Sequence, residues 1–148
     1  MTVTYSSYLH LDELLAAQQP LSDGPEHDEM LFIVIHQVYE LWFKQLLHEV
    51  GYLGTALEQD DLPRVYATLK RFLTILKVQV AQIDILETMS PVSFLSFRAR
   101  LDTASGFQSP QFRELEFVLG RRSARMIAHH AGTPAADRDV LDRLHGQA

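Results

Sequence analysis

The sequence has 148 residues, enough for one domain with a sizeable core, and its 19 acidic side chains outnumber 13 basic ones to give a formal charge of −6. This balance argues against a nucleic-acid-binding surface and against a basic membrane-facing helix. The absence of cysteine excludes disulfides, thiolate metal sites and cysteine nucleophiles. No apolar run approaches the roughly 20 residues that span a bilayer, and no signal peptide is recognised, so we expect a cytoplasmic protein that binds small molecules or other protein chains.

The N-terminal segment carries aromatic residues ahead of any sustained helical pattern. Tyr5 and Tyr8 lie here, and because loose termini are normally polar, they indicate that the segment docks against another surface. The spacing predicts a short amphipathic helix over Leu11–Gln19, which Pro20 ends. Residues 1–22 are therefore interpreted as a docking arm with a short helix.

The longest predicted helix begins at His27 and runs to about Glu58. Its apolar residues recur at steps of three and four, which keeps one stripe toward a core: Phe32, Ile35, Tyr39, Trp42, Leu46, Val50 and Leu53. His36 lies beside this stripe, and a buried imidazole must find hydrogen-bond partners. A carbonyl group or the carboxylate of Glu40 would satisfy it in an ordinary core; a catalytic or ligand-binding role is the alternative, and spacing alone does not decide between them.

A second long helix is predicted after a turn at Gln59–Asp61. Its apolar residues repeat the same steps: Val65, Leu69, Phe72, Leu76, Val80, Ile83 and Leu86. A short connection lets the two helices lie antiparallel. No strand-like alternation is present, so the prediction is an all-α fold, a helical bundle built on two long antiparallel helices in a single domain of residues 1–148.

Shorter elements follow the second helix. Ser90 is a candidate N-cap for a short helix that carries Phe94, Phe97, Arg98 and Leu101. The segment Asp102–Pro110 is predicted to be a loop, in which Gly106 can let a ligand approach the main chain. A further helix is predicted over Gln111–Leu119, and residues 121–148 form a weakly helical tail.

Three long segments resemble one protein family. They are TYSSYLHLDELLAAQ, HDEMLFIVIHQVYELWFKQLLHEV and ETMSPVSFLSFRARLDTASGFQSPQFRELE, and they look like the tryptophan 2,3-dioxygenases in order and spacing from about residue 4 to residue 120, with residues 26–120 as the family-like core. That family is all-α, haem-dependent and homotetrameric. It inserts both atoms of dioxygen across the indole 2,3-bond of L-tryptophan to give N-formylkynurenine.

The resemblance implies roles for individual residues. His36 is similar to the distal histidine that hydrogen-bonds the indole nitrogen, and Arg98 resembles the arginine that pairs with the substrate carboxylate, a task suited to its planar fork of donors.

The indole pocket would be lined by Phe32, Ile33, Phe94 and Leu101. Ser105 and Gly106 resemble the loop that closes over substrate and the haem edge. The arm residues that would reach the active site of a neighbouring subunit are Tyr5, Tyr8 and Leu9. Without the family, Arg98 would be an ordinary surface charge, Phe94 core packing and Ser105–Gly106 a plain turn.

The iron ligand has no counterpart by position. Family members extend past the equivalent of Ala148, and that part carries the proximal histidine and the threonine region that contacts the substrate ammonium group. His129, His130 and His145 lie in the tail, where one could act as axial ligand, although exposed surface histidines are the ordinary interpretation, and no ligand is assigned.

Three hypotheses follow. The chain is a haem dioxygenase of tryptophan, or a relative that oxidises a tryptophan-like biosynthetic precursor; or it is a catalytically silent helical module that assembles with another chain or with itself; or it is an incomplete sequence whose function resides in a longer protein. The resemblance favours the first, a haem-dependent dioxygenase that acts on L-tryptophan. A bundle that lacks half of its helices would expose apolar surface and need a partner.

Overall fold

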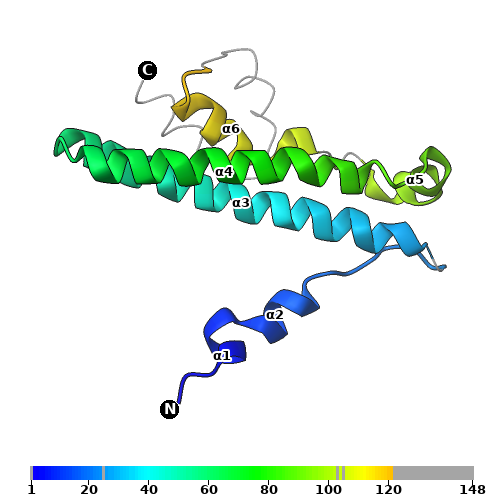
Figure 1. The fold of residues 1–148 in the computed structure, drawn as a ribbon. Coiled ribbons are helices and arrows are strands. Elements are labelled where there is room, and N and C mark those ends of the chain that lie inside the picture. The colour runs from blue at the N-terminus through cyan, green and yellow to red at the C-terminus, as the bar shows by residue number, and fades with distance from the viewer. Residues whose placement is uncertain (1, 25, 103, 105, 122–148) are drawn as a thin grey trace.

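The structure is a computed structural model that describes residues 2–24, 26–102, 104 and 106–121. All regular elements in these ranges are helices (Figure 1): α1 (Tyr5–Leu9), α2 (Leu11–Ala16), α3 (His27–Glu58), α4 (Leu62–Leu86), α5 (Pro91–Arg98), the 3₁₀ turns η1 (Ala99–Leu101) and η2 (Gly106–Gln108), and α6 (Pro110–Val118). The predicted all-α fold is confirmed. The region predicted as a weakly helical tail, from residue 122 onward, lies outside the described residues.

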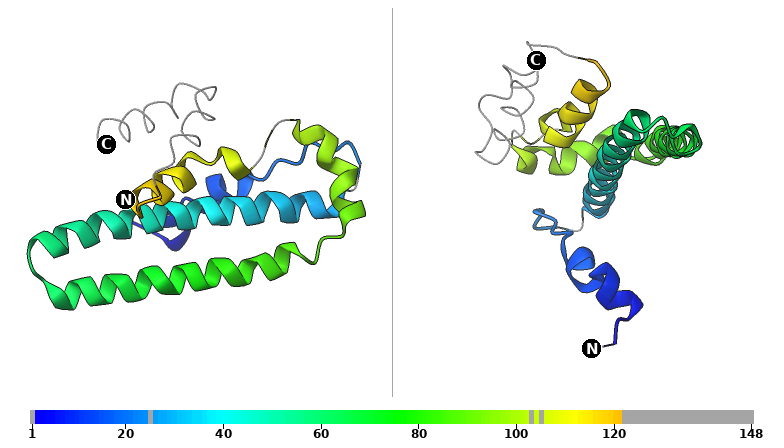
Figure 2. Two further views of the ribbon diagram at one scale, coloured as in Figure 1. Left: turned by 90° about the horizontal axis from the view of Figure 1, so that it is seen from above. Right: turned by 90° about the vertical axis from the view of Figure 1, so that its left-hand side faces the viewer.

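The two long helices form the predicted antiparallel hairpin (Figure 2). The turn between α3 and α4 is short, and Asp60 adopts a left-handed φ of 53° within it. Asp61 then caps α4 by accepting a hydrogen bond from the amide of Arg64, and Pro63 occupies the first turn, where a missing N–H costs nothing. The predicted end of the first long helix at about Glu58 and the predicted turn at Gln59–Asp61 are confirmed.

The core lies where α3, α4 and α6 meet. Leu46, Phe72, Ile75 and Leu115 are buried there, with Trp42, Phe43 and other half-buried apolar side chains around them. Figure 2 shows α6 on the side of α3 that faces away from α4, so α3 lies in the middle. The short helix α5 crosses the end of the hairpin and contacts the first turns of α3.

The stripe predicted for α4 is confirmed only in part: Phe72 lies in the core and Leu76 packs against it, but other members of the stripe are exposed. The buried residues of α4 are Thr68, Phe72, Ile75 and Gln79, whereas Leu69, Val80 and Ile83 are exposed. Apolar residues occupy more than one face of α4, so more than one stripe fits the three-and-four spacing. The face that packs against α3 is the one that includes the polar residues Thr68 and Gln79.

The N-terminal arm lies apart from the hairpin (Figure 1). Neither α1 nor α2 buries a residue, and α1, which was not predicted as a helix, is capped by Thr4 and ends at His10 with a left-handed φ of 51°. The arm contacts α3 just after α2, where Nε2 of Gln37 donates to the carbonyl oxygen of Ala17 at 3.1 Å. In the described ranges no helix is long and apolar enough to cross a membrane.

Candidate active site

His36 is half-buried on the first half of α3, and its Nδ1 lies 2.7 Å from the carbonyl oxygen of Phe32. A carbonyl oxygen can only accept, so in the neutral imidazole the proton is on Nδ1 and the lone pair is on Nε2. The partner is therefore the backbone carbonyl one turn earlier rather than the carboxylate of Glu40. This hydrogen bond satisfies one nitrogen and leaves the other as an acceptor.

A cavity of about 260 Å³ lies beside this imidazole. It is lined by Phe32, His36, Glu40, Ala104, Gly106, Gln108 and Ser109. A Cβ placed on Gly106 would lie 3.9 Å from both Cδ2 and Nε2 of His36, so the missing side chain leaves room directly over the acceptor nitrogen. The predicted close approach of main chain and ligand at Gly106 therefore has the space it requires.

Phe32 is the phenyl ring that lines the cavity, and behind it an aromatic cluster joins α5 to α3. The Phe32 ring lies 4.2 Å from the imidazole of His36 and 5.8 Å from the ring of Phe94, measured between centroids. Phe97, which is fully buried, lies 5.6 Å from both phenyl rings. These are the distances at which offset and edge-to-face pairs are favourable. Phe97 was predicted only as an apolar residue of its helix, yet it supports the two rings nearest the histidine.

Arg98 ends α5 and is half-buried. Its Nη1 donates to the carbonyl oxygen of Asp102 at 2.9 Å, and in the described part of the chain this is its one hydrogen bond. The bond fixes the guanidinium against the start of the loop that follows, where Asp102 has a left-handed φ of 46°. The remaining guanidinium N–H groups are free to bind a further acceptor.

Other predicted site residues lie outside the cavity in this chain. Arg98, Leu101 and Ile33 do not line it, and Phe94 reaches it only through its ring contact with Phe32. The arm residues Tyr5, Tyr8 and Leu9 are exposed, the two tyrosines by 77% and 75%, which leaves them available to another surface. Ser105, and the tail residues His129, His130 and His145, lie outside the described residues. The structure therefore brings together Phe32, His36, Phe94 and Gly106.

Polar residues that the sequence analysis missed complete the site. Gln111, on the first turn of α6, donates through Nε2 to the backbone carbonyl of Glu40 at 3.1 Å and to its carboxylate at 2.8 Å. Ser109 caps α6 by accepting from the amide of Phe112 at 3.1 Å. These bonds fix the start of α6, and with it the end of the loop, against α3. The Ser109-Pro110 pair was a recognisable capping signal, whereas the pairing of Gln111 with Glu40 requires the tertiary fold.

Glu29 anchors the connection between the arm and α3. It is 1% exposed and accepts from the amides of Leu21 and Ser22 at 2.7 and 3.1 Å and from the Ser22 hydroxyl. Burial raises the pKa of this carboxyl, but the hydrogen bonds from Ser22 and Leu21 outweigh burial, so its pKa lies below the ordinary value. Arg100 adds bonds to the Leu21 carbonyl and to Asp23 at 3.3 and 2.9 Å. The segment that leads from the arm into α3 is thus held by Glu29 of α3 and by Arg100 of η1.

Comparison of the amino-acid sequence with known proteins shows which family the chain resembles. A sequence model of the family described as Tryptophan 2,3-dioxygenase matches residues 1–144. Three proteins named tryptophan 2,3-dioxygenase are similar to the chain. The one from Herpetosiphon aurantiacus is 57% identical, and the match covers 92% of this chain and 52% of the relative. The one from Anaeromyxobacter sp. strain K is 61% identical over 85% of this chain and 47% of the relative, and the one from Nocardioides sp. is 51% identical over 95% of this chain and 54% of the relative. The chain spans about half the length of the curated relatives it matches.

Proposed function

Because this chain belongs to the tryptophan 2,3-dioxygenase family, we propose that it forms the substrate-binding wall of a haem-dependent enzyme that opens the indole ring of L-tryptophan. The reaction would add both atoms of dioxygen across the indole 2,3-bond to give N-formylkynurenine, the first step in tryptophan breakdown through kynurenine.

The acceptor nitrogen of His36 carries this proposal. The Phe32 carbonyl holds the proton on Nδ1, so Nε2 can accept a hydrogen bond from an indole N–H. Phe32 supplies an aromatic face next to that nitrogen, and Gly106 leaves the space above it open. A flat aromatic ligand with one N–H donor fits this combination of acceptor, ring and space. In the proposal His36 is the catalytic residue, since it contacts and orients the reacting ring.

Arg98 would bind the other end of the substrate. Among the described residues Arg98 bonds through Nη1 to the Asp102 carbonyl alone, so the rest of the guanidinium can pair with a carboxylate. Arg98 bonds to the carbonyl of Asp102, and the segment that follows supplies Ala104 and Gly106 to the cavity wall, so carboxylate and indole recognition would be coupled through this segment. Ile33, Phe94, Leu101 and Ser105 belong to this proposed pocket through their match to the family pattern.

In this proposal haem lies beside the cavity that Phe32, His36 and Gly106 line, because an aromatic ring and a neutral imidazole suit a flat, largely apolar cofactor. When bound, haem iron would supply the dioxygen chemistry that no side chain can perform. Among the described residues no group of three or more His, Cys, Asp or Glu side chains could hold a metal ion, and we assign no axial ligand. The role of the described residues is to position substrate.

Assembly is part of the proposal. Large apolar side chains of α4 and α5 are exposed, including Leu73 at 64%, Val80 at 67% and Val92 at 78%, and such surface is normally covered by another chain. The exposed Tyr5, Tyr8 and Leu9 on an arm that lies apart from the hairpin suit docking at a neighbouring subunit. We therefore propose a homo-oligomer, a tetramer as in the family, that works in the cytoplasm where free L-tryptophan is available.

The test is an absorption spectrum of the purified chain with added haem, recorded with and without L-tryptophan. We expect a sharp Soret band that shifts when L-tryptophan is added. A spectrum that remains that of free haem in both cases would contradict haem binding by this chain alone.

A variant sharpens the test of His36. His36→Ala should weaken L-tryptophan binding by about 1 kcal/mol, the value of one hydrogen bond, while the helix content stays unchanged. It should not change the binding of 1-methyl-L-tryptophan, which has no indole N–H to donate. Equal losses for the two compounds would show that His36 does not recognise the N–H group.

A further inference from the structure

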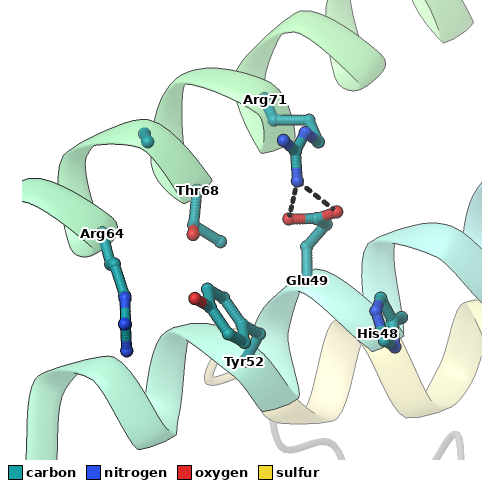
Figure 3. Close-up of a pocket in the computed structure, with 7 residues that line it drawn as sticks. His48, Glu49, Tyr52, Arg64, Thr68 and Arg71 are labelled. Carbon is teal, nitrogen blue, oxygen red and sulfur yellow. Dashed lines mark hydrogen bonds and ion pairs between the residues drawn. The ribbon is translucent and has the colours of Figure 1, made fainter.

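A second cavity, of about 280 Å³, lies between the second half of α3 and the first half of α4 (Figure 3). It is lined by His48, Glu49, Tyr52, Arg64, Ala67, Thr68 and Arg71. None of these residues lines the cavity beside His36. The proposed dioxygenase site therefore does not account for this cluster of polar side chains.

The carboxylate of Glu49, which lines this cavity, already has hydrogen-bond partners within the chain. Glu49 is 2% exposed, and Nη1 of Arg71 lies 3.1 Å from each of its carboxylate oxygens. Gln45 donates to the same carboxylate at 2.6 Å. A buried carboxylate with these partners is neutralised and has little capacity to accept from a ligand. Arg71 uses one nitrogen for this ion pair, and its other N–H groups remain.

Thr68 brings an unpartnered hydroxyl to the cavity. Its side chain is 3% exposed, and the hydroxyl has no hydrogen-bond partner in the described part of the chain. Other helical threonines behave differently, since Thr55 and Thr74 donate to the carbonyl four residues earlier. Figure 3 shows the Thr68 hydroxyl pointing across the gap toward the hydroxyl of Tyr52. The hydroxyl oxygen is accessible from the cavity, since it is not one of the buried side-chain atoms without a partner, so a ligand or water can bind it there.

Arg64 adds further donors on the same face of α4. Its Nε pairs with Asp61 at 3.1 Å, which leaves both terminal amino groups without a partner among the described residues. Arg64, Thr68 and Arg71 follow one another at helical steps, so they face α3 together. The groups left over are guanidinium N–H donors and hydroxyls, and a ligand that mainly accepts hydrogen bonds suits them.

We propose that this cavity binds a small oxyanion, a phosphate or a carboxylate, between Arg64 and the hydroxyls of Thr68 and Tyr52. Arg71 contributes by holding Glu49 in its ion pair, away from the anion. The two arginine charges are balanced by Glu49 and Asp61. Affinity therefore comes from directed hydrogen bonds more than from net positive charge, and we expect weak but saturable binding.

The experiment is an NMR titration of the purified chain with inorganic phosphate and, separately, with acetate, at constant ionic strength set with chloride. We expect saturable shifts of the Thr68 and Tyr52 backbone amides and of the Arg64 Nε–H. Arg64→Gln and Thr68→Val should each weaken binding by about tenfold or more. Thr68→Val keeps the size of the side chain, so it tests the hydroxyl even if Arg64→Gln does not fold.

Two matched variants serve as controls. Arg121→Gln removes an exposed arginine that pairs with Glu116, and Thr74→Val removes a hydroxyl that donates to a backbone carbonyl. Both should leave the titration unchanged. Saturation by phosphate, by acetate or by both supports the proposal and identifies the anion. Shifts that never saturate, that chloride reproduces, or that are lost equally in the controls would overturn it.

Discussion

The two long helices differ in what covers them. Among the described elements α3 contacts α4, α5 and α6, whereas α4 has extensive contact with α3 alone. The proposed active site lies on the covered helix, where the segment between α5 and α6 lines the cavity beside His36. On α4 many apolar side chains remain exposed. Two helices with similar apolar content thus have different roles: α3 organises a site within this chain, and α4 presents a surface.

The largest expected effect is the loss of a core side chain on α3. Leu46 is fully buried, so Leu46→Ala should lower the free energy of unfolding by about 2–5 kcal/mol. The matched variant Leu73→Ala, on the exposed face of α4, should cost no more than about 0.5 kcal/mol in the monomer. Urea unfolding measures both. Similar losses at low protein concentration would break the distinction between the two helices.

Arg98→Ala tests the contribution of α5 to the site on α3. If its partner carboxylate is buried in the complex, the variant should weaken L-tryptophan binding by roughly 2–5 kcal/mol. Calorimetric titration of the haem-reconstituted protein measures this. Arg98→Lys is the control for charge without the planar fork, and it should recover only part of the loss. Unchanged affinity in Arg98→Ala would remove Arg98 from the site.

Gln111→Ala tests how α6 is held against α3. The variant deprives the partly buried carboxylate of Glu40 of its hydrogen bond, so we expect a loss of about 1–3 kcal/mol in the free energy of unfolding. The amide of Gly106 should also shift in NMR spectra, because the loop over His36 ends at α6. Gln19→Ala, on the arm, serves as control and should change neither.

Glu29 gives the smallest effect, and one that depends on pH. Its pKa is lowered in the folded protein, so its stabilising contribution is fully present above the unfolded value of about 4.3 and is lost as the pH falls through the lowered value. Wild type should therefore lose more stability than Glu29→Gln when urea unfolding is followed from pH 6 to about pH 3. Parallel curves for the two proteins would show that Glu29 does not anchor the arm through its charge.

The sequence predicted the positions of the long helices well and the faces through which they pack less well. Capping and turn residues such as Ser90 and Asp61 are local signals, so the extent of α3 and the starts of α4 and α5 followed from them, whereas the end of α5 before Leu101 did not. The buried face of α4 did not follow, because apolar residues on several faces satisfy the helical period equally. The arm helix α1 was missed, since its five residues are too few for a periodic pattern.

The site shows the same division. His36 was recognised because an imidazole beside an apolar stripe needs a partner, and the resemblance supplied Phe32, Phe94 and Gly106. The sequence left the partner of His36 open between a carbonyl group and the Glu40 carboxylate, and the link from Gln111 to Glu40 could not be predicted. The first depends on a side-chain rotamer, and the second joins residues that are distant in the sequence.

The hydrogen bond between His36 and the Phe32 carbonyl has a consequence for the entropy of binding. The acceptor is a backbone atom of the same helix, so the imidazole is oriented by α3 itself before any ligand arrives. An ordered side chain loses little rotational freedom on binding, and the cost of immobilising it has already been met during folding. The imidazole is in this sense preorganised: its geometry is a property of the helix and does not have to be induced by the ligand.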